Sequence, residues 1–84
     1  MIISLLIKTL YYMNKKNKIK IVVNGKFLTV NLKFSLKNLT EKFKTPINKV
    51  AIELNEEIVD KKKINKIFLK NNDKIEIVHF IGGG

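Results

Sequence analysis

The residues at the carboxyl end are the part of this sequence best suited to chemistry. Gly82, Gly83 and Gly84 directly follow the apolar run Val78–Ile81. Glycine loses more conformational freedom on ordering than any other residue and packs least, so a terminus built from it normally frays. Three glycines at this position therefore indicate either unselected slack or a requirement for a thin, unbranched carboxyl end.

The other side chains offer few catalytic groups. The sequence contains no phosphate-binding glycine loop, no metal-ligand cluster and no nucleophile–base pair. His79 is the one histidine, and without companions it is expected to be a packed or half-exposed side chain rather than a ligand or a base. Cysteine is absent, which excludes disulfides, thiolate metal sites and cysteine nucleophiles and fits a reducing compartment. We expect a protein that is not an enzyme and that binds no metal.

The charge of the chain is strongly positive, but its pattern differs from that of a specific nucleic-acid site. The formal net charge is +10, and all 17 basic residues are lysines. Sites that contact bases or phosphates usually use arginine for bidentate contacts and interleave aromatic side chains. Here the lysines are spread along the chain, with one short run at Lys61–Lys63. We predict a solvated lysine surface and no specific nucleic-acid partner; a basic RNA-binding module is the alternative from a different functional class.

The length of the chain limits its organisation. Eighty-four residues form at most one small domain, which favours a carrier, adaptor or binding module. Residues 1–12 are apolar or aromatic apart from Ser4, Lys8 and Thr9. This segment is shorter than the roughly 20 residues that span a bilayer, and it lacks the basic start of a secretory signal. An extra strand, a docked helix and a second start at Met13 stay open for it. The predicted organisation is an N-terminal extension over residues 1–17 and a domain over residues 18–84, without a membrane partner.

The first half of this domain predicts a hairpin followed by a helix. Lys18–Val23 alternates and is rich in β-branched residues, and Asn24-Gly25 is a strong hairpin signal because a type I′ turn needs positive φ at both positions. Phe27–Leu32 is the return strand. Ser35 is the predicted helix N-cap, and the helix ends before Thr45-Pro46 because the residue preceding proline disfavours the helical region. The apolar stripe of this helix consists of Leu36, Leu39 and Phe43.

The second half predicts three further strands. Val50–Leu54 alternates, and a short strand follows at Ile58-Val59. A lysine-rich connector with scattered apolar residues leads to a turn at Asn71–Asp73. Lys74–Ile81 is the last strand. This order predicts an α+β fold, a mixed sheet with one main helix across one face.

Strand alternation sorts the residues of the last strand into two faces. If Ile75 and Ile77 face the helix, Val78 and Phe80 point to the uncovered side of the sheet. An exposed apolar pair beside the terminal glycines suits a docking surface, and Ile81 completes the candidate docking residues. The alternative, that the N-terminal segment or the connector covers these side chains, stays open.

Several segments together resemble the ThiS family, the sulfur carrier proteins of thiamine biosynthesis, which have the ubiquitin-like β-grasp fold. The resemblance covers roughly residues 18–84. It rests on IVVNGK at Ile21–Lys26, ELNEEIV at Glu53–Val59, NDKIEIVHF at Asn72–Phe80 and the terminal glycines. In this fold the last strand lies centrally in the sheet, and the tail leaves from its end.

The resemblance implies a chemistry for the terminal carboxylate. A ThiF-like adenylating enzyme would use ATP to form an acyl-adenylate on Gly84, a sulfur donor such as a cysteine desulfurase would supply the sulfur of a thiocarboxylate, and a ThiG-like thiazole synthase would receive it. An α-carboxylate has a pKa of about 3.5 and is ionised at neutral pH, and glycine leaves the carboxyl carbon uncrowded. The carrier itself would bind no cofactor. The expected compartment is the bacterial cytoplasm or the plastid stroma.

Two related families share this terminal chemistry. The small subunit of molybdopterin synthase also ends in Gly-Gly and carries a thiocarboxylate, but that family tends to have a proline before the tail, where this chain has Val78-His79-Phe80-Ile81. A protein-modifying ubiquitin-like role would use the same activated carboxylate with lysine as the acceptor.

Overall fold

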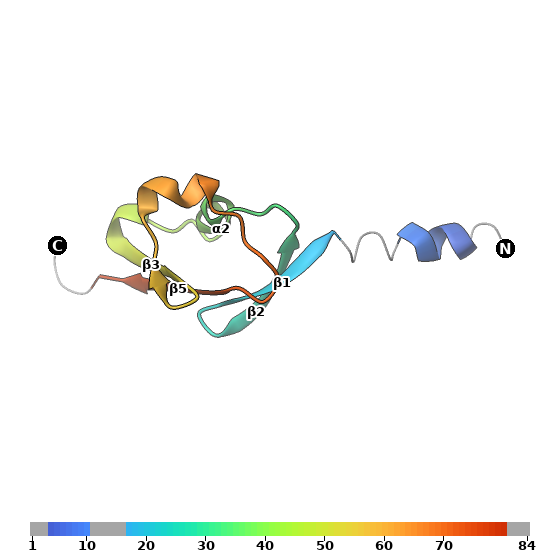
Figure 1. Cartoon of the computed structure of the whole chain (residues 1–84), viewed down its shortest axis with the longest axis horizontal. Coiled ribbons are helices and arrows are strands. Elements are labelled where there is room, and N and C mark those ends of the chain that lie inside the picture. The colour runs from blue at the N-terminus through green and yellow to red at the C-terminus, as the bar shows by residue number, and fades with distance from the viewer. Residues whose placement is uncertain (1–3, 11–16, 81–84) are drawn as a thin grey trace.

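The last strand of the chain lies in the middle of the sheet, between strands from the first and the second half of the sequence. The computed structural model describes residues 4–10 and 17–80. In the order in which they pair, the strands of the sheet are β2 (Lys26–Asn31), β1 (Lys18–Val23), β5 (Lys74–His79), β3 (Val50–Leu54) and β4 (Glu57–Ile58). β1 and β5 are parallel, and the other neighbours are antiparallel. Helix α2 (Leu36–Lys42) and the 3₁₀ helix η2 (Lys61–Lys66) lie on one side of this sheet (Figure 1). The predicted mixed-sheet, β-grasp fold is confirmed.

Asn24 makes the hairpin turn and also connects the hairpin to β5. Asn24 and Gly25 have φ of 49° and 80°, as the predicted type I′ turn requires. The parallel pairing of β1 with β5 ends at Val23 and Ile75. Beyond it, the Ile77 backbone N–H donates to Asn24 Oδ1 over 2.8 Å, and the Asn24 backbone N–H donates to the Ile75 carbonyl over 2.9 Å. One asparagine therefore continues the contact between the two strands after the regular ladder has ended.

Helix α2 begins where the sequence predicts. The Asn38 backbone N–H donates to Ser35 Oγ over 3.0 Å, and the Ser35 N–H donates to Asn38 Oδ1 over 2.9 Å, so the two residues form a capping box. Leu36 and Leu39 are fully buried, as predicted. Phe43 is not part of the buried stripe and is 49% exposed. The helix ends at Lys42, and Phe43 is its C-cap.

Two strand boundaries differ from the prediction by one residue, each because of a turn. β2 ends at Asn31 instead of Leu32, because the chain turns at Lys33, which has φ of 67°. β4 covers Glu57–Ile58 instead of Ile58-Val59, because Asn55 and Glu56 both have positive φ and form a two-residue turn. β5 ends at His79, and Ile81, predicted as its last residue, lies outside the described residues.

The core lies between the sheet and the layer formed by α2 and the connector. The connector is fixed to the start of α2 because the Leu36 N–H donates to the Ile67 carbonyl and the Leu69 N–H donates to the Phe34 carbonyl. Its apolar residues Ile64 and Leu69 are buried. The buried apolar side chains are Ile19, Ile21, Val23, Val30, Leu36, Leu39, Val50, Ile52, Ile64, Leu69 and Ile75.

Residues 4–10 form a short helix in which every residue is exposed. The helix carries four apolar side chains, Leu5, Leu6, Ile7 and Leu10, which are 54–67% exposed. The described part is helical and not an extra strand, but its exposed residues do not confirm the docked helix that the sequence leaves open. Within the described residues no helix is both long enough and apolar enough to cross a membrane.

Candidate functional site

The carboxyl end of β5 is hydrogen-bonded to the sheet up to Phe80. His79 pairs with Val50 of β3, and the Phe80 N–H donates to the Lys49 carbonyl over 3.0 Å. Lys49 is the last residue of the 3₁₀ helix η1 (Ile47–Lys49), which leads directly into β3. The sequence after Phe80 is Ile81, Gly82, Gly83 and Gly84, and these residues lie outside the described part of the chain. The structure therefore describes the scaffold up to Phe80, which Ile81 separates from the first glycine in the sequence.

The two described docking candidates are exposed. Ile75 is fully buried and Ile77 packs against the core, so these residues face the helix layer as alternation predicts. Val78 is 49% exposed and Phe80 is 61% exposed. Within the described residues neither side chain is therefore buried by the N-terminal segment or the connector, although Lys61 of the connector lies 5.3 Å from the Phe80 ring centroid. A docking role for Val78, Phe80 and Ile81 stays a prediction.

Val78 belongs to a larger apolar surface on the side of the sheet away from the helices. Opposite pairs in an antiparallel ladder share a face, which places Val22 with Phe27, Ala51 with Val78, and Ile58 with Glu53. Phe27 is 73% exposed and Ile58 is 79% exposed. We call this surface the open face; its apolar members are Val22, Phe27, Ala51, Ile58 and Val78.

Charged side chains lie among the apolar residues of the open face. The Lys20 ammonium lies 5.0 Å from the centroid of the Phe27 ring, and Lys74 and Glu76 form an ion pair of 3.6 Å. A partner that docks here would therefore meet apolar area with charges of both signs beside it. The sequence analysis missed Phe27 and Ile58 as surface residues, although the Asn24-Gly25 turn fixes the register that pairs Phe27 with Val22.

Lys61 contacts both β3 and the end of β5. Its ammonium donates to the Val50 carbonyl over 2.8 Å and to the Ile47 carbonyl over 3.0 Å. The same ammonium lies 5.3 Å from the centroid of the Phe80 ring, within the range of a cation–π contact. We call Lys49, Val50, Lys61 and Phe80 the tail base. No sequence signal identifies Lys61, because it begins a run of three lysines that is typical of a solvated surface.

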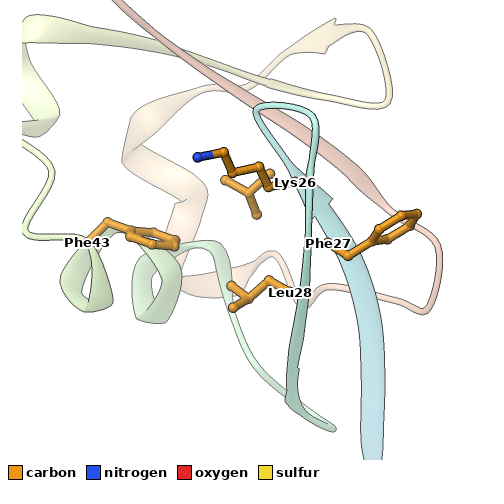
Figure 2. Close-up of a pocket in the computed structure, with 5 residues that line it drawn as sticks. Lys26, Phe27, Leu28 and Phe43 are labelled. Carbon is orange, nitrogen blue, oxygen red and sulfur yellow. The ribbon is translucent and has the colours of Figure 1, made fainter.

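An apolar pocket of about 270 Å³ lies between the β1–β2 hairpin and the end of α2 (Figure 2). Lys26, Leu28 and Phe43 lie on the pocket side of β2, whereas the Phe27 ring points to the other side of the strand (Figure 2). The pocket explains why Phe43 is half exposed: its ring borders an open hollow. Its lining has a single charged group, so it contains no set of convergent polar groups that would fix a ligand.

The other predicted site features have these positions. His79 is exposed at the end of β5, so of the two placements that the sequence suggested, packed or half-exposed, the packed one is wrong. Among the described residues no three His, Asp, Glu or Cys side chains gather as ligands for a metal ion. Gly82, Gly83 and Gly84 lie outside the described residues, so the role of Gly84 stays a prediction.

Comparison with known proteins decides the family. The sequence model of the ThiS family matches residues 29–84, about two thirds of the chain, and this match includes the terminal glycines. The chain belongs to the ThiS family. The sulfur carrier protein ThiS of Bacillus subtilis is 49% identical over 35 residues, which are 42% of this chain and 53% of that protein.

Two further similarities support membership of the ThiS family. The crystal structure of the thiamine biosynthesis protein ThiS from Geobacter metallireducens matches with a TM-score of 0.69 and 29% identity, over 79% of this chain and 100% of that one. A thiazole synthase of Paramagnetospirillum magneticum is 37% identical over 65 residues. Those residues are 77% of this chain but 20% of the synthase, so the chain spans only a fifth of that relative.

Proposed function

We propose that this chain is a sulfur carrier whose Gly84 carboxylate is adenylated and then converted to a thiocarboxylate, which delivers sulfur for thiazole formation in thiamine biosynthesis. The observation that carries the proposal is the ThiS family match through Gly84, on a β-grasp domain whose central strand ends just before the glycines. A bare carboxylate on unbranched glycine is a nucleophile for the α-phosphate of ATP, and its carbon is then open to attack by sulfur.

The proposal assigns the catalytic groups to partner enzymes. A ThiF-like enzyme would bind ATP and the carrier, and a cysteine desulfurase would supply the sulfur. Val78, Phe80 and Ile81, with the open face beside them, would form the surface that these enzymes recognise. Apolar area of this kind, next to charges of both signs, suits a transient interface that must form and release several times. The chain would act in the bacterial cytoplasm or the plastid stroma.

A ThiG-like thiazole synthase is the proposed acceptor of the sulfur. The similarity to the Paramagnetospirillum magneticum protein supports this, because a segment resembling most of this chain makes up a fifth of a protein named thiazole synthase. A carrier segment and a synthase in one polypeptide would work at high effective concentration. The thiamine-related names of the similar proteins favour this role over the molybdopterin synthase small subunit and over an RNA-binding module.

Intact-mass spectrometry tests the proposed chemistry. Incubation of the full chain with ATP and a ThiF-like enzyme should add AMP, and addition of a sulfur donor should then replace one terminal oxygen by sulfur. A chain lacking Gly83 and Gly84 is the matched control and should give neither product. Absence of the adduct on the full chain would contradict the proposal. RNA binding that depends on salt and survives removal of the two glycines would favour the basic binding module instead.

A further inference from the structure

Lys61 occupies a position where a main-chain donor is missing. Along the outer edge of β3, the Ile52 carbonyl accepts a hydrogen bond from the Val59 N–H over 2.9 Å. The next carbonyl on that edge, Val50, accepts instead from the Lys61 ammonium over 2.8 Å. The same ammonium reaches the Ile47 carbonyl over 3.0 Å, so it joins η1 to the first residue of β3.

The same ammonium also contacts the last described residue of the chain. It lies 5.3 Å from the Phe80 ring centroid, and the Phe80 N–H donates to the carbonyl of Lys49. Phe80 is therefore held on two sides, through its backbone by Lys49 and through its ring by Lys61. Because Phe80 is 61% exposed, its ring is not part of the core, and these are the two polar contacts that the described structure gives it.

We propose that Lys61 is a positioning residue for activation of the carrier: by orienting Phe80, it sets the direction in which the chain leaves the sheet toward Gly84. The inference rests on the proposed function. It adds Lys61, which is not part of the docking surface, to the residues that serve that function. Lys61 touches neither ATP nor the reacting carboxylate in this scheme, so it acts through Phe80.

The distance from Phe80 to the carboxylate explains why this direction matters. The segment from Ile81 to Gly84 can span about 13 Å when extended, at about 3.3 Å per residue. A change at Phe80 therefore shifts the region that the carboxylate can reach, and a misplacement of about 1 Å at the reacting atom can already cost a hundredfold in rate. Three of the four residues are glycines, which impose no direction of their own. Fixing the start of the segment raises the fraction of carriers that enter the partner correctly.

The test compares Lys61→Met with Lys62→Met in adenylation of the full chain by a ThiF-like enzyme with ATP. Methionine keeps the unbranched stem and removes the ammonium. Lys62 is the neighbouring exposed residue, and its ammonium makes no hydrogen bond or ion pair within the described residues. We expect kcat/KM to fall about tenfold for Lys61→Met, equal to about 1.4 kcal/mol, and to stay within about twofold for Lys62→Met. Equal values for the two variants would overturn the proposal.

A second measurement separates positioning from a loss of folding. Amide hydrogen exchange at Phe80 should accelerate in Lys61→Met, while exchange at Val22 of β1, whose N–H donates to the Asp73 carbonyl over 2.9 Å, stays at the wild-type rate. Equal acceleration at both amides would mean general destabilisation and would overturn the proposal.

Phe80→Leu removes the ring and keeps an apolar side chain, so combining it with Lys61→Met should cost no more than the worse single change; additive losses would count against a route through Phe80. If wild-type protein is not adenylated at all, the proposed function fails, whereas the exchange measurement still reports whether Lys61 orients Phe80.

Discussion

Replacing Asn24 by alanine should destabilise the whole domain, because this residue connects the hairpin to the strand that leads to the glycines. Its Oδ1 accepts the Ile77 N–H over 2.8 Å, and its Nδ2 lies 3.4 Å from the Ile77 carbonyl. Its backbone has φ of 49°, in the left-handed region that asparagine tolerates and alanine does not.

The expected loss is about 2 kcal/mol in the free energy of unfolding. The short hydrogen bond contributes about 1 kcal/mol, and the left-handed backbone costs alanine about 1 kcal/mol more than asparagine. The 3.4 Å contact is too long to add much. For a domain of this size, such a loss corresponds to a fall in melting temperature of about 8–16 °C.

Urea denaturation of three variants separates the two contributions. Asn24→Gly removes the side-chain hydrogen bond but tolerates the backbone, so we expect it to lose about half as much stability as Asn24→Ala. Asn24→Asp keeps the acceptor for the Ile77 N–H and should stay within about 0.5 kcal/mol of the wild type. The dependence on urea should keep its slope in all three. An Asn24→Ala protein as stable as the wild type would refute the reasoning that this side chain replaces the missing strand pairing.

Three further predictions concern the carboxyl end and the helix. Gly84→Ala places a methyl group beside the reacting carbon, so the rate of adenylation, measured by mass spectrometry, should fall on the order of a hundredfold while the melting temperature is unchanged. Adenylation at the normal rate would contradict the proposed role. Phe80→Ala removes an exposed ring, so the Kd for a ThiF-like enzyme should rise about 30-fold, while the free energy of unfolding falls by far less than the free energy of binding. Equal losses in the two free energies would assign the ring to the core. Ser35→Ala removes the capping box and should cost about 1 kcal/mol in urea denaturation, with Asn38→Ala expected to cost less because the Ser35 cap remains.

The elements of this fold are predictable from the sequence where local chemistry determines them. β1, the Asn24-Gly25 turn and the Ser35 cap follow from strand alternation, positive φ and side-chain capping, and the structure has each of them at the predicted residue. The boundaries of β2 and β4 were wrong because residues other than glycine or asparagine take a positive φ beside them. Lys33 and Glu56 do so, and neither residue type signals a left-handed turn in advance.

The candidate site was predictable in part for a similar reason. The exposure of Val78 and Phe80 follows from alternation along one strand, which is a local property. The position of Lys61 depends on three contacts with residues 11 to 19 positions away in the sequence, to Val50, Ile47 and Phe80. In the sequence it cannot be distinguished from Lys62 and Lys63, because a lysine that hydrogen-bonds to carbonyls and one that faces water are the same residue type in the same run.

The supports of β5 change along its length, and this gradient connects the fold to the proposed function. At its start the strand has β1 on one side and β3 on the other, and Ile75 is fully buried. At Ile77 the Asn24 side chain takes the place of β1, and from Val78 onward the ladder continues with β3 alone. At Phe80 the strand is held by one backbone hydrogen bond to Lys49 and by the Lys61 ammonium over the ring. The free energy of local opening should therefore decrease from Ile75 to Phe80. A carrier needs this order of stabilities. The start of the strand must stay in the sheet for the chain to remain folded, whereas weaker contacts at its end allow the last residues to move from one partner to the next.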